Sequence, residues 1–386
     1  MSTKRTGFDR TWVSERLAFA IRAGGAEADG AEALFRANEA SHLRLAESAI
    51  IQASRVVEGQ VAMRVVVDGK AARATTTDLT DEGLRSCAQL AASRARLAPA
   101  RDEKIVLPSP SDGVGESAGI DPTTAWLDAP TKERWLHDAL MAHDRDGLAL
   151  AGRFHTGLMT VAVASTEGVD AYHQGSWSDV ALSALERPAG HGASSYRAAF
   201  NRQVDAEDIQ SLQEEVRQEC HRARDPVEID PGEWDVVLAP AAVAELMEWM
   251  GMIAFRSSAL EDGTSFVASR CGQQVTGASV SISDDASMPQ GVGVSLPFDV
   301  EGQRKQRVSL VDEGVARGVV HDSMSARRAG CQGTGHAQLD DVFPEPGSEA
   351  GHLHMSPGDA ETDSLIGQLK RGLYVTRFHY VNGMLE

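Results

Sequence analysis

This sequence of 386 residues lacks an excess of positive charge. Lysine and arginine together number 37, whereas aspartate and glutamate number 56, so the formal net charge is −19. A surface of that sign repels phosphate backbones and anionic lipid headgroups. We therefore expect neither nucleic acid nor a membrane surface as a partner.

An uncharged apolar run long enough to cross a bilayer is also missing. The longest apolar stretch, residues 236–255, contains Glu245 and Glu248, each of which would cost about 2–3 kcal/mol or more near the membrane centre. We predict a buried strand followed by a helix there. The start, MSTKRTGFDR, is not followed by the apolar run of a secretory signal, so we expect a cytoplasmic protein.

Paired cysteines are absent as well. Four cysteines lie far apart with no C-x-x-C spacing, at Cys87, Cys220, Cys271 and Cys331. Neither a disulfide framework nor a zinc knuckle is indicated. Isolated thiols of this kind are mostly small buried hydrophobes, which is what we predict here.

The length exceeds what one hydrophobic core usually organises, and the sequence changes character twice. Residues 1–107 alternate Ala-rich helices with a strand pair. Residues 108–225 start with a Pro/Ser/Gly-rich linker, predicted over 107–126, and continue with helices and two long strands. Residues 226–386 contain short β-prone runs after one helix. The predicted class is α+β, with an amino-terminal α/β domain, a middle α+β domain and a sheet-rich carboxy-terminal domain.

Local signals support this division. Asp68-Gly69 between two β-prone runs predicts a two-residue hairpin. Thr80 is suited to cap the helix that follows it. The helix predicted over 205–223 begins with acidic residues and ends with basic ones, as the helix dipole favours.

Segments in three stretches resemble the TldD/PmbA family. The first is VVVDGKAARATTTDLTDEGL, residues 65–84, and the last is the tail SPGDAETDSLIGQLKRGLYVTRF, residues 356–378. The second covers residues 263–337, in which the matching positions are Ser265-Phe266, Gly272, Asp284-Asp285, Pro297-Phe298-Asp299, Glu301-Gly302, Asp312-Glu313-Gly314, Ser325-Ala326-Arg327 and Thr334-Gly335-His336.

The family's catalytic branch carries H-E-x-x-x-H on a helix, where two histidines bind zinc and the glutamate acts as base. The corresponding helix here is PAAVAELMEWMG, residues 240–251. An ungapped count places the motif over Glu248, Trp249 and Ile253, and no histidine occurs between His221 and His321. Apolar residues at i, i+3, i+4 and i+7 instead predict a packed helix face, formed by Val243, Leu246, Met247 and Met250.

The missing motif implies a member of the PmbA (TldE)-like branch. By resemblance, such a chain is a non-catalytic subunit that pairs with a zinc-bearing TldD-like subunit in a metallopeptidase acting on peptides or unfolded segments. Catalytic residues and cofactor are then expected in the partner, with zinc bound there and none in this chain. Two alternatives stay open: an enzyme in its own right with an unrecognised metal site, and a peptide-binding scaffold that forms a homodimer or larger homo-oligomer.

Two sets of residues are candidates for a site. His336, His352 and His354 could bind a metal, because residues two apart on a strand point to the same face. By the family resemblance, the two subunits enclose a chamber. The other set is predicted to line that chamber or the subunit interface, and comprises Asp299, Glu301, Gly302, Arg304, Thr334 and Gly335. If this segment is extended, Asp299 and Glu301 share one face.

The carboxy-terminal domain is shorter than is usual in the family, since the sequence stops at Glu386 where further strands would follow. An unpaired sheet edge invites pairing with another chain. We therefore expect a partner to cover that edge or the domain to be rearranged.

Overall fold

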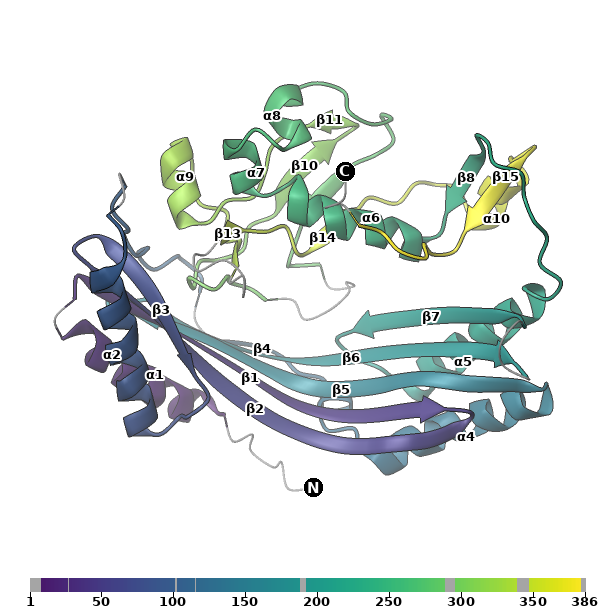
Figure 1. Cartoon of the computed structure of the whole chain (residues 1–386), viewed down its shortest axis with the longest axis horizontal. Coiled ribbons are helices and arrows are strands. Elements are labelled where there is room, and N and C mark those ends of the chain that lie inside the picture. The colour runs from purple at the N-terminus through teal and green to yellow at the C-terminus, as the bar shows by residue number, and fades with distance from the viewer. Residues whose placement is uncertain are drawn as a thin grey trace. The chain divides into compact units, whose positions relative to one another are not determined.

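The computed structural model describes residues 8–26, 28–100, 103–114, 116–187, 192–288, 296–338 and 347–382. The chain divides into two compact units (Figure 1). The sheet unit comprises Met1–Ala100, Gly115–Glu228 and Met288–Ser295, and the second unit comprises Arg101–Val114, Ile229–Ser287 and Leu296–Glu386. Segments 1–107 and 108–225, predicted as separate domains, both contribute strands to the sheet unit: β1 (Gly30–Ala46) pairs with β5 (Leu148–Ser165).

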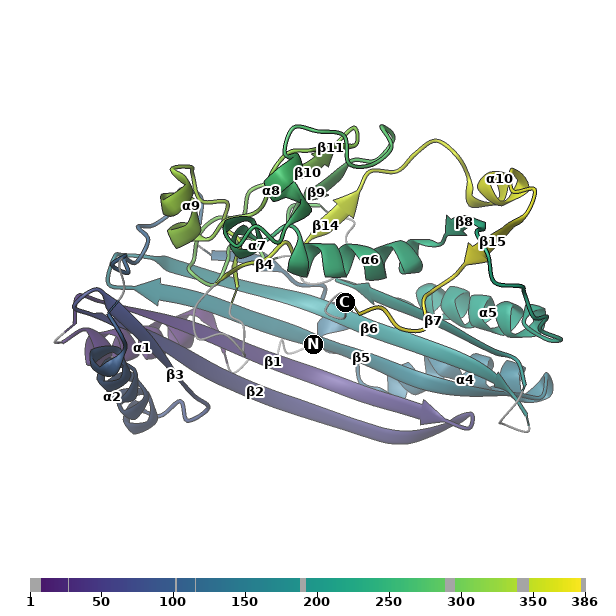
Figure 2. The same ribbon diagram turned by 45° about the horizontal axis from the view of Figure 1, so that its top comes forward.

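The sheet unit is built on a seven-stranded sheet of long, mostly antiparallel strands (Figure 2). The strands are β1 (Gly30–Ala46), β2 (Ala49–Val67), β3 (Lys70–Thr76), β4 (Glu116–Gly119), β5 (Leu148–Ser165), β6 (Asp170–Glu186) and β7 (Ser194–Asn201). Their order is β3-β2-β1-β5-β6-β4, and β7 also pairs with β6. Among the strand pairs described in this sheet, β4 is parallel to β6 and the others are antiparallel. The linker predicted over 107–126 is thus partly regular structure, since β4 joins the sheet.

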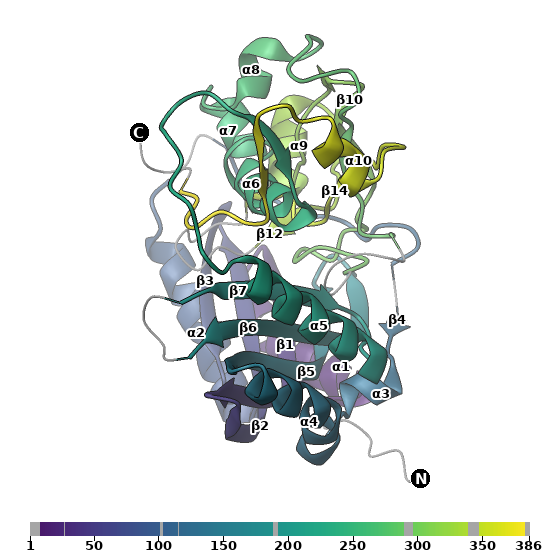
Figure 3. The same ribbon diagram turned by 90° about the vertical axis from the view of Figure 1, so that its right-hand side faces the viewer.

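Helices cover one face of this sheet. They are α1 (Arg10–Gly25), α2 (Asp81–Leu97), α3 (Pro122–Ala125), α4 (Ala129–Arg145) and α5 (Ala206–Arg222). On β1, Ala33 and Phe35 belong to the core under α1 and α2, and Leu43 and Leu45 belong to the core under α4 and α5. These residues have the same parity along the strand, so both cores lie on the same face. α4 and α5 pack against each other and against β5 and β6 (Figure 3).

The local predictions for this unit are confirmed. Asp68 and Gly69 form the turn between β2 and β3, and both have positive φ angles, 53° and 71°. The Thr80 side chain caps α2 by accepting a hydrogen bond from the Gly83 nitrogen. Asp205 caps α5 in a reciprocal capping box.

The second unit consists of short elements, as the β-prone runs predict. Its helices are α6 (Pro240–Ile253), α7 (Ser257–Glu261), α8 (Phe266–Arg270), α9 (Ser323–Ala329) and α10 (Thr362–Gly367). Its strands are β8 (Asp235–Leu238), β9 (Ile282–Asp284), β10 (Val308–Asp312), β11 (Val315–Ala316), β12 (Ala337–Gln338), β13 (Gly347–Ser348), β14 (Leu353–Met355) and β15 (Gly372–Val375). The α+β class is confirmed. Phe255, Leu310 and Val320 lie at the centre of the unit's core.

Three predictions about burial are wrong. β8 is not a buried strand: Val236 is 52% exposed, since β8 has only β15 as a partner among the described strands. On α6, Leu246 lies outside the packed face. Cys87 and Cys220 are buried as predicted, but the other two cysteines, Cys271 and Cys331, are exposed.

None of the helices within the described ranges has the length and apolar character that a membrane-spanning helix requires.

Candidate functional site

The helix α6 is fixed in place by close packing. Ala242, Met247 and Gly251 are its buried residues. A Cβ atom at Gly251 would lie 2.5 Å from the carbonyl oxygen of Ala350, a separation that real side chains do not reach. Only glycine allows the helix to lie directly on that backbone.

The positions that the family resemblance assigns to zinc ligands do not fit a zinc ion. Glu248 is exposed, Trp249 is half-buried and Ile253 is 38% exposed. Zinc takes imidazole nitrogen, thiolate sulfur or carboxylate oxygen, and only one of these three side chains offers such an atom. In the part of the chain that the structure describes, no group of three or more His, Cys, Asp or Glu residues could hold a metal ion. α6 therefore lacks the donors of a zinc site.

The predicted loop starts as a tight turn instead of an extended strand. Oδ1 of Asp299 accepts hydrogen bonds from the backbone nitrogens of Glu301 and Gln303, both at 2.9 Å. Its Oδ2 accepts one from the Ala337 nitrogen, also at 2.9 Å. Gly302 has a φ of 68°, which closes the turn. The segment is not extended, so the condition for a shared strand face is not met: the Asp299 side chain accepts hydrogen bonds from the backbone that follows it.

Both carboxylates of this turn are buried, with Asp299 at 4% exposure and Glu301 at 0%. Burial and the neighbouring Glu301 charge raise the pKa of Asp299 to about 8, against the effect of its three backbone donors. Glu301 accepts a hydrogen bond from the Ser323 nitrogen, at the start of α9. The pKa of Asp322, which caps α9, is likewise raised by burial and by the Glu301 charge. These carboxylates hold the turn and α9 together.

The remaining residues of the predicted loop come together beside this turn. Arg304 is exposed, and both Arg304 and Gly335 line one pocket of the second unit. Gly335 has a φ of 70°, and a Cβ atom there would lie 2.1 Å from the Arg304 carbonyl oxygen. The Thr334 hydroxyl donates to the His321 carbonyl at 2.9 Å and accepts from the His321 nitrogen at 2.7 Å. Tertiary folding thus brings residues 299–304 and 334–335 into contact.

His336 forms a fully buried pair with Asp284. Its Nε2 lies 2.8 Å from Oδ1 of Asp284, and both side chains have 0% exposure. Its Nδ1 lies 2.8 Å from the Thr334 carbonyl oxygen. Both contacts are hydrogen bonds when the two ring nitrogens carry protons, as in an imidazolium paired with a carboxylate. Burial acts to raise the pKa of Asp284, but the hydrogen bond and charge of His336, with the charge of Lys305 and a backbone donor, lower it overall.

The three histidines proposed as metal ligands are arranged around Asp284 and β9. The backbone nitrogen of His352 donates to Oδ2 of Asp284 at 2.8 Å. Its ring Nδ1 lies 3.2 Å from the Lys305 ammonium nitrogen. His354 is on β14, opposite Ser283 of β9. The Lys305 ammonium group lies at hydrogen-bond distance from the His352 ring, and the Asp284 carboxylate pairs with the His336 ring. Such contacts are typical of an ion-pair network rather than of a metal centre.

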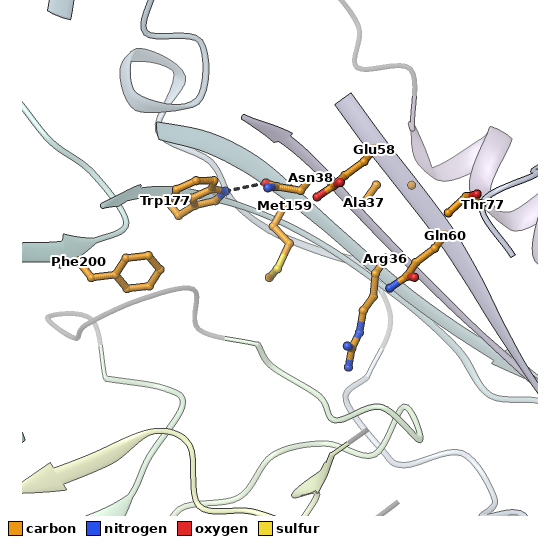
Figure 4. A pocket seen from close by; sticks show the side chains of 10 residues that line it. Arg36, Ala37, Asn38, Glu58, Gln60, Thr77, Met159, Trp177 and Phe200 are labelled. Carbon is orange, nitrogen blue, oxygen red and sulfur yellow. Dashed lines mark hydrogen bonds between the residues drawn. The ribbon is translucent and has the colours of Figure 1, made fainter. Parts of the chain in front are cut away.

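A second pocket lies on the face of the sheet opposite the helices, with a volume of about 500 Å³ (Figure 4). Trp177, Met159 and Phe200 supply its apolar wall. The Trp177 indole nitrogen donates to Oδ1 of Asn38 at 3.0 Å, which fixes the ring. A Cβ atom at Gly157 would lie 2.9 Å from that indole, so glycine makes room for it. An apolar pocket with a few polar groups at its rim is suited to bind an apolar side chain.

Sequence reasoning missed Lys305 and the pocket around Trp177. The basic run RKQR at 304–307 contains Lys305 but does not show that its ammonium group contacts His352. For the pocket around Trp177, the sequence offers one signal, which is a large aromatic residue in a strand whose side chains alternate between the two faces of the sheet. Its depth depends on Gly157, which lies on another strand and faces Trp177 across the β5–β6 pairing.

Comparisons with known proteins identify the family. Residues 231–384 match the PmbA/TldA metallopeptidase C-terminal domain, and residues 31–95 match the PmbA/TldA metallopeptidase domain 1. The chain is 31% identical over 153 residues to the metalloprotease TldD homolog of Haemophilus influenzae. It is 24% identical over 172 residues to a metalloprotease of Methanothermobacter thermautotrophicus. These matches cover 40% and 45% of this chain, and the chain spans only 30% and 37% of the length of those relatives.

A solved structure supports the fold over almost the whole chain. The crystal structure of TldE from Thermococcus kodakarensis superposes with a TM-score of 0.84, at 19% identity, and covers 95% of this chain and 83% of that one. At this identity the likeness concerns the fold. The two matched domains show that this chain belongs to the PmbA/TldD family of metallopeptidase type.

Proposed function

We propose that this chain is a TldE-like, non-catalytic subunit of a heteromeric zinc metallopeptidase that acts on peptides or unfolded segments. The observation that carries the proposal is on α6. At the positions over which an ungapped count places H-E-x-x-x-H, this helix presents Glu248, Trp249 and Ile253. A hydrolytic zinc site needs three protein ligands and an open position for water, and these side chains do not provide them.

In this proposal, zinc and the bond-breaking step belong to a TldD-like partner that carries the motif. This chain contributes binding surface and helps enclose the substrate. The pocket around Trp177 supports a role in holding peptides, since its apolar wall is suited to an apolar side chain. The exposed residue of the predicted chamber or interface loop, Arg304, is the part of that loop available to a partner or substrate.

The test is to purify this chain alone, and together with a TldD-like chain from the same host, for native mass spectrometry and metal analysis. We expect a complex with zinc in the partner only, and peptide hydrolysis only when both chains are present. Stoichiometric zinc and chelator-sensitive hydrolysis by this chain alone would overturn the proposal. A homo-oligomer that never joins such a partner would favour the scaffold alternative.

A paired variant tests the remaining alternative, a metal site within this chain. His352→Ala and His354→Ala together remove two of the three candidate ligands. Full hydrolysis by a complex that contains the double variant is expected. Loss of zinc from this chain together with loss of activity would instead indicate a metal site of its own.

A further inference from the structure

The second unit contains a pocket of about 330 Å³ whose chemistry the proposed function does not use. One wall comes from the segment 103–114, and the others come from residues 303–306 and from α9 with the turn after it. The segment is held by the Gln303 side-chain amide, which accepts from the Ser111 hydroxyl at 2.7 Å and donates to the Ser109 carbonyl at 3.0 Å. Ile105 and Leu107 are buried, which anchors the segment further.

Two arginines, Arg304 and Arg327, line this pocket, and both are exposed. Within the described ranges neither forms an ion pair, although the chain carries 19 more acidic than basic residues. Their neighbours differ in this respect. Arg307 lies 3.7 Å from the Asp285 carboxylate, and Arg328 forms salt bridges with Glu103 and Glu261. The pocket therefore offers two guanidinium groups to an anion from outside this chain.

Part of the pocket wall is apolar. Val106 is 48% exposed, and Pro108 and Met324 line the same pocket. Inorganic phosphate would leave such a wall in contact with water. A carboxylate that is attached to, or adjacent to, an apolar side chain would use both features, because burial of the side chain adds to the charge-assisted hydrogen bonds.

We propose that this pocket binds a peptide carboxylate flanked by an apolar side chain, with Arg304 and Arg327 as its partners. The carboxylate is either that of the C-terminal residue or that of an internal Asp or Glu. The assignment does not depend on the proposed function, because binding is a property of this chain and is measured without a partner subunit.

Cys331 provides a direct readout, because this exposed thiol lines the pocket. Cys271 is exposed elsewhere, with its thiol 3.5 Å from the Arg317 carbonyl, and serves as the internal control. The full chain is labelled with N-ethylmaleimide, and the rate at each thiol is followed by mass spectrometry. A bound peptide at about ten times its Kd should slow labelling of Cys331 about tenfold and leave Cys271 unchanged.

Four ligands separate the sources of the anion. The first is a peptide with uncharged side chains that ends in leucine with a free C-terminal carboxylate, and the second is the same peptide with an amidated C-terminus. The third is the amidated peptide with a Glu beside the leucine, and the fourth is inorganic phosphate. Protection by the free acid assigns the C-terminal carboxylate, and protection by the Glu-containing amide assigns a side chain. Protection by the neutral amide or by phosphate equal to that by the acids would overturn the proposal, as would no protection by any peptide.

Matched variants test the two arginines. Arg304→Gln and Arg327→Gln should each weaken protection by about 10–100-fold in peptide concentration, the effect of one charge-assisted hydrogen bond. Arg307→Gln removes the same charge three residues away, outside the pocket, and should bind as the unmodified chain does. Circular dichroism establishes that each variant is folded. Equal binding by all three variants would refute the assignment.

Discussion

The buried pair between His336 and Asp284 leads to the sharpest prediction. His336→Ala leaves the Asp284 carboxylate buried with a backbone donor and the Lys305 charge but without its ring partner. Removing one member of a buried pair typically costs about 3–5 kcal/mol. For a unit of this size that loss lowers the melting temperature by about 6–20 °C.

Asp284→Asn is the informative counterpart. Its amide oxygen can accept from the His352 nitrogen while its NH₂ group donates to Nε2 of a neutral His336, whose Nδ1 still donates to the Thr334 carbonyl. Both hydrogen bonds survive in uncharged form, so we expect a loss of only about 1 kcal/mol. The contrast compares a buried carboxylate that has lost its ring partner with a neutral amide that keeps both hydrogen bonds.

Hydrogen exchange measured by mass spectrometry on peptides that contain β9 and β12 restricts the readout to the second unit, and thermal unfolding supplies the size of the effect.

The pH dependence of the stability that Asp284 contributes has a defined sign. Because the pKa of Asp284 is lowered in the fold, its stabilisation is present above the unfolded pKa of about 3.9 and is lost as the pH falls through the folded value. Equal losses in the two variants, or a loss below about 1 kcal/mol for His336→Ala, would refute the reasoning.

Two further predictions concern backbone geometry and a buried lysine. Gly335→Ala should lower the free energy of unfolding by more than about 2 kcal/mol, since a Cβ atom at φ 70° would meet the Arg304 carbonyl. Gly330→Ala is the control: Gly330 has a φ of 65° with nothing within 4 Å of a Cβ atom, so the loss should be about 1 kcal/mol. Equal melting temperatures of the two variants would contradict this. Burial lowers the pKa of Lys132 to about 7, below its unfolded value of about 10.4, so the folded chain binds fewer protons between these values. Urea unfolding should therefore show the unmodified chain gaining up to about 1.4 kcal/mol per pH unit relative to Lys132→Met between pH 7 and 10, whereas parallel pH profiles would exclude the shift.

Much of the local structure follows from the sequence. The Asp68-Gly69 hairpin and the Thr80 cap depend on residues within four positions of one another, so their signals are complete in a short segment. The α+β class follows from the same local patterns. The absence of histidine from α6 is also independent of folding, because no tertiary arrangement can add an imidazole to that helix.

The polar network of the second unit could not be predicted in this way. Asp284, Lys305, His336 and His352 are spread over nearly 70 positions, and only the packing of β9 against its neighbours brings them together. The sequence places Asp299 in a charged segment that is predicted to line a chamber or an interface. Its burial follows from contacts with residues such as Ala337, which is 38 positions away, so a local sequence pattern cannot predict it.

The sequence by itself determined the short-range elements, the acidic charge and the lack of zinc ligands on α6, because each depends on residue type or on near neighbours. Tertiary structure alone decided which polar groups lose water and which stay accessible. It buried Asp299 and Glu301, and it placed Arg304 and Arg327 around one pocket with a segment almost 200 positions earlier. Burial and long-range contact are properties of the whole folded chain, since they depend on what the rest of the chain packs against each residue.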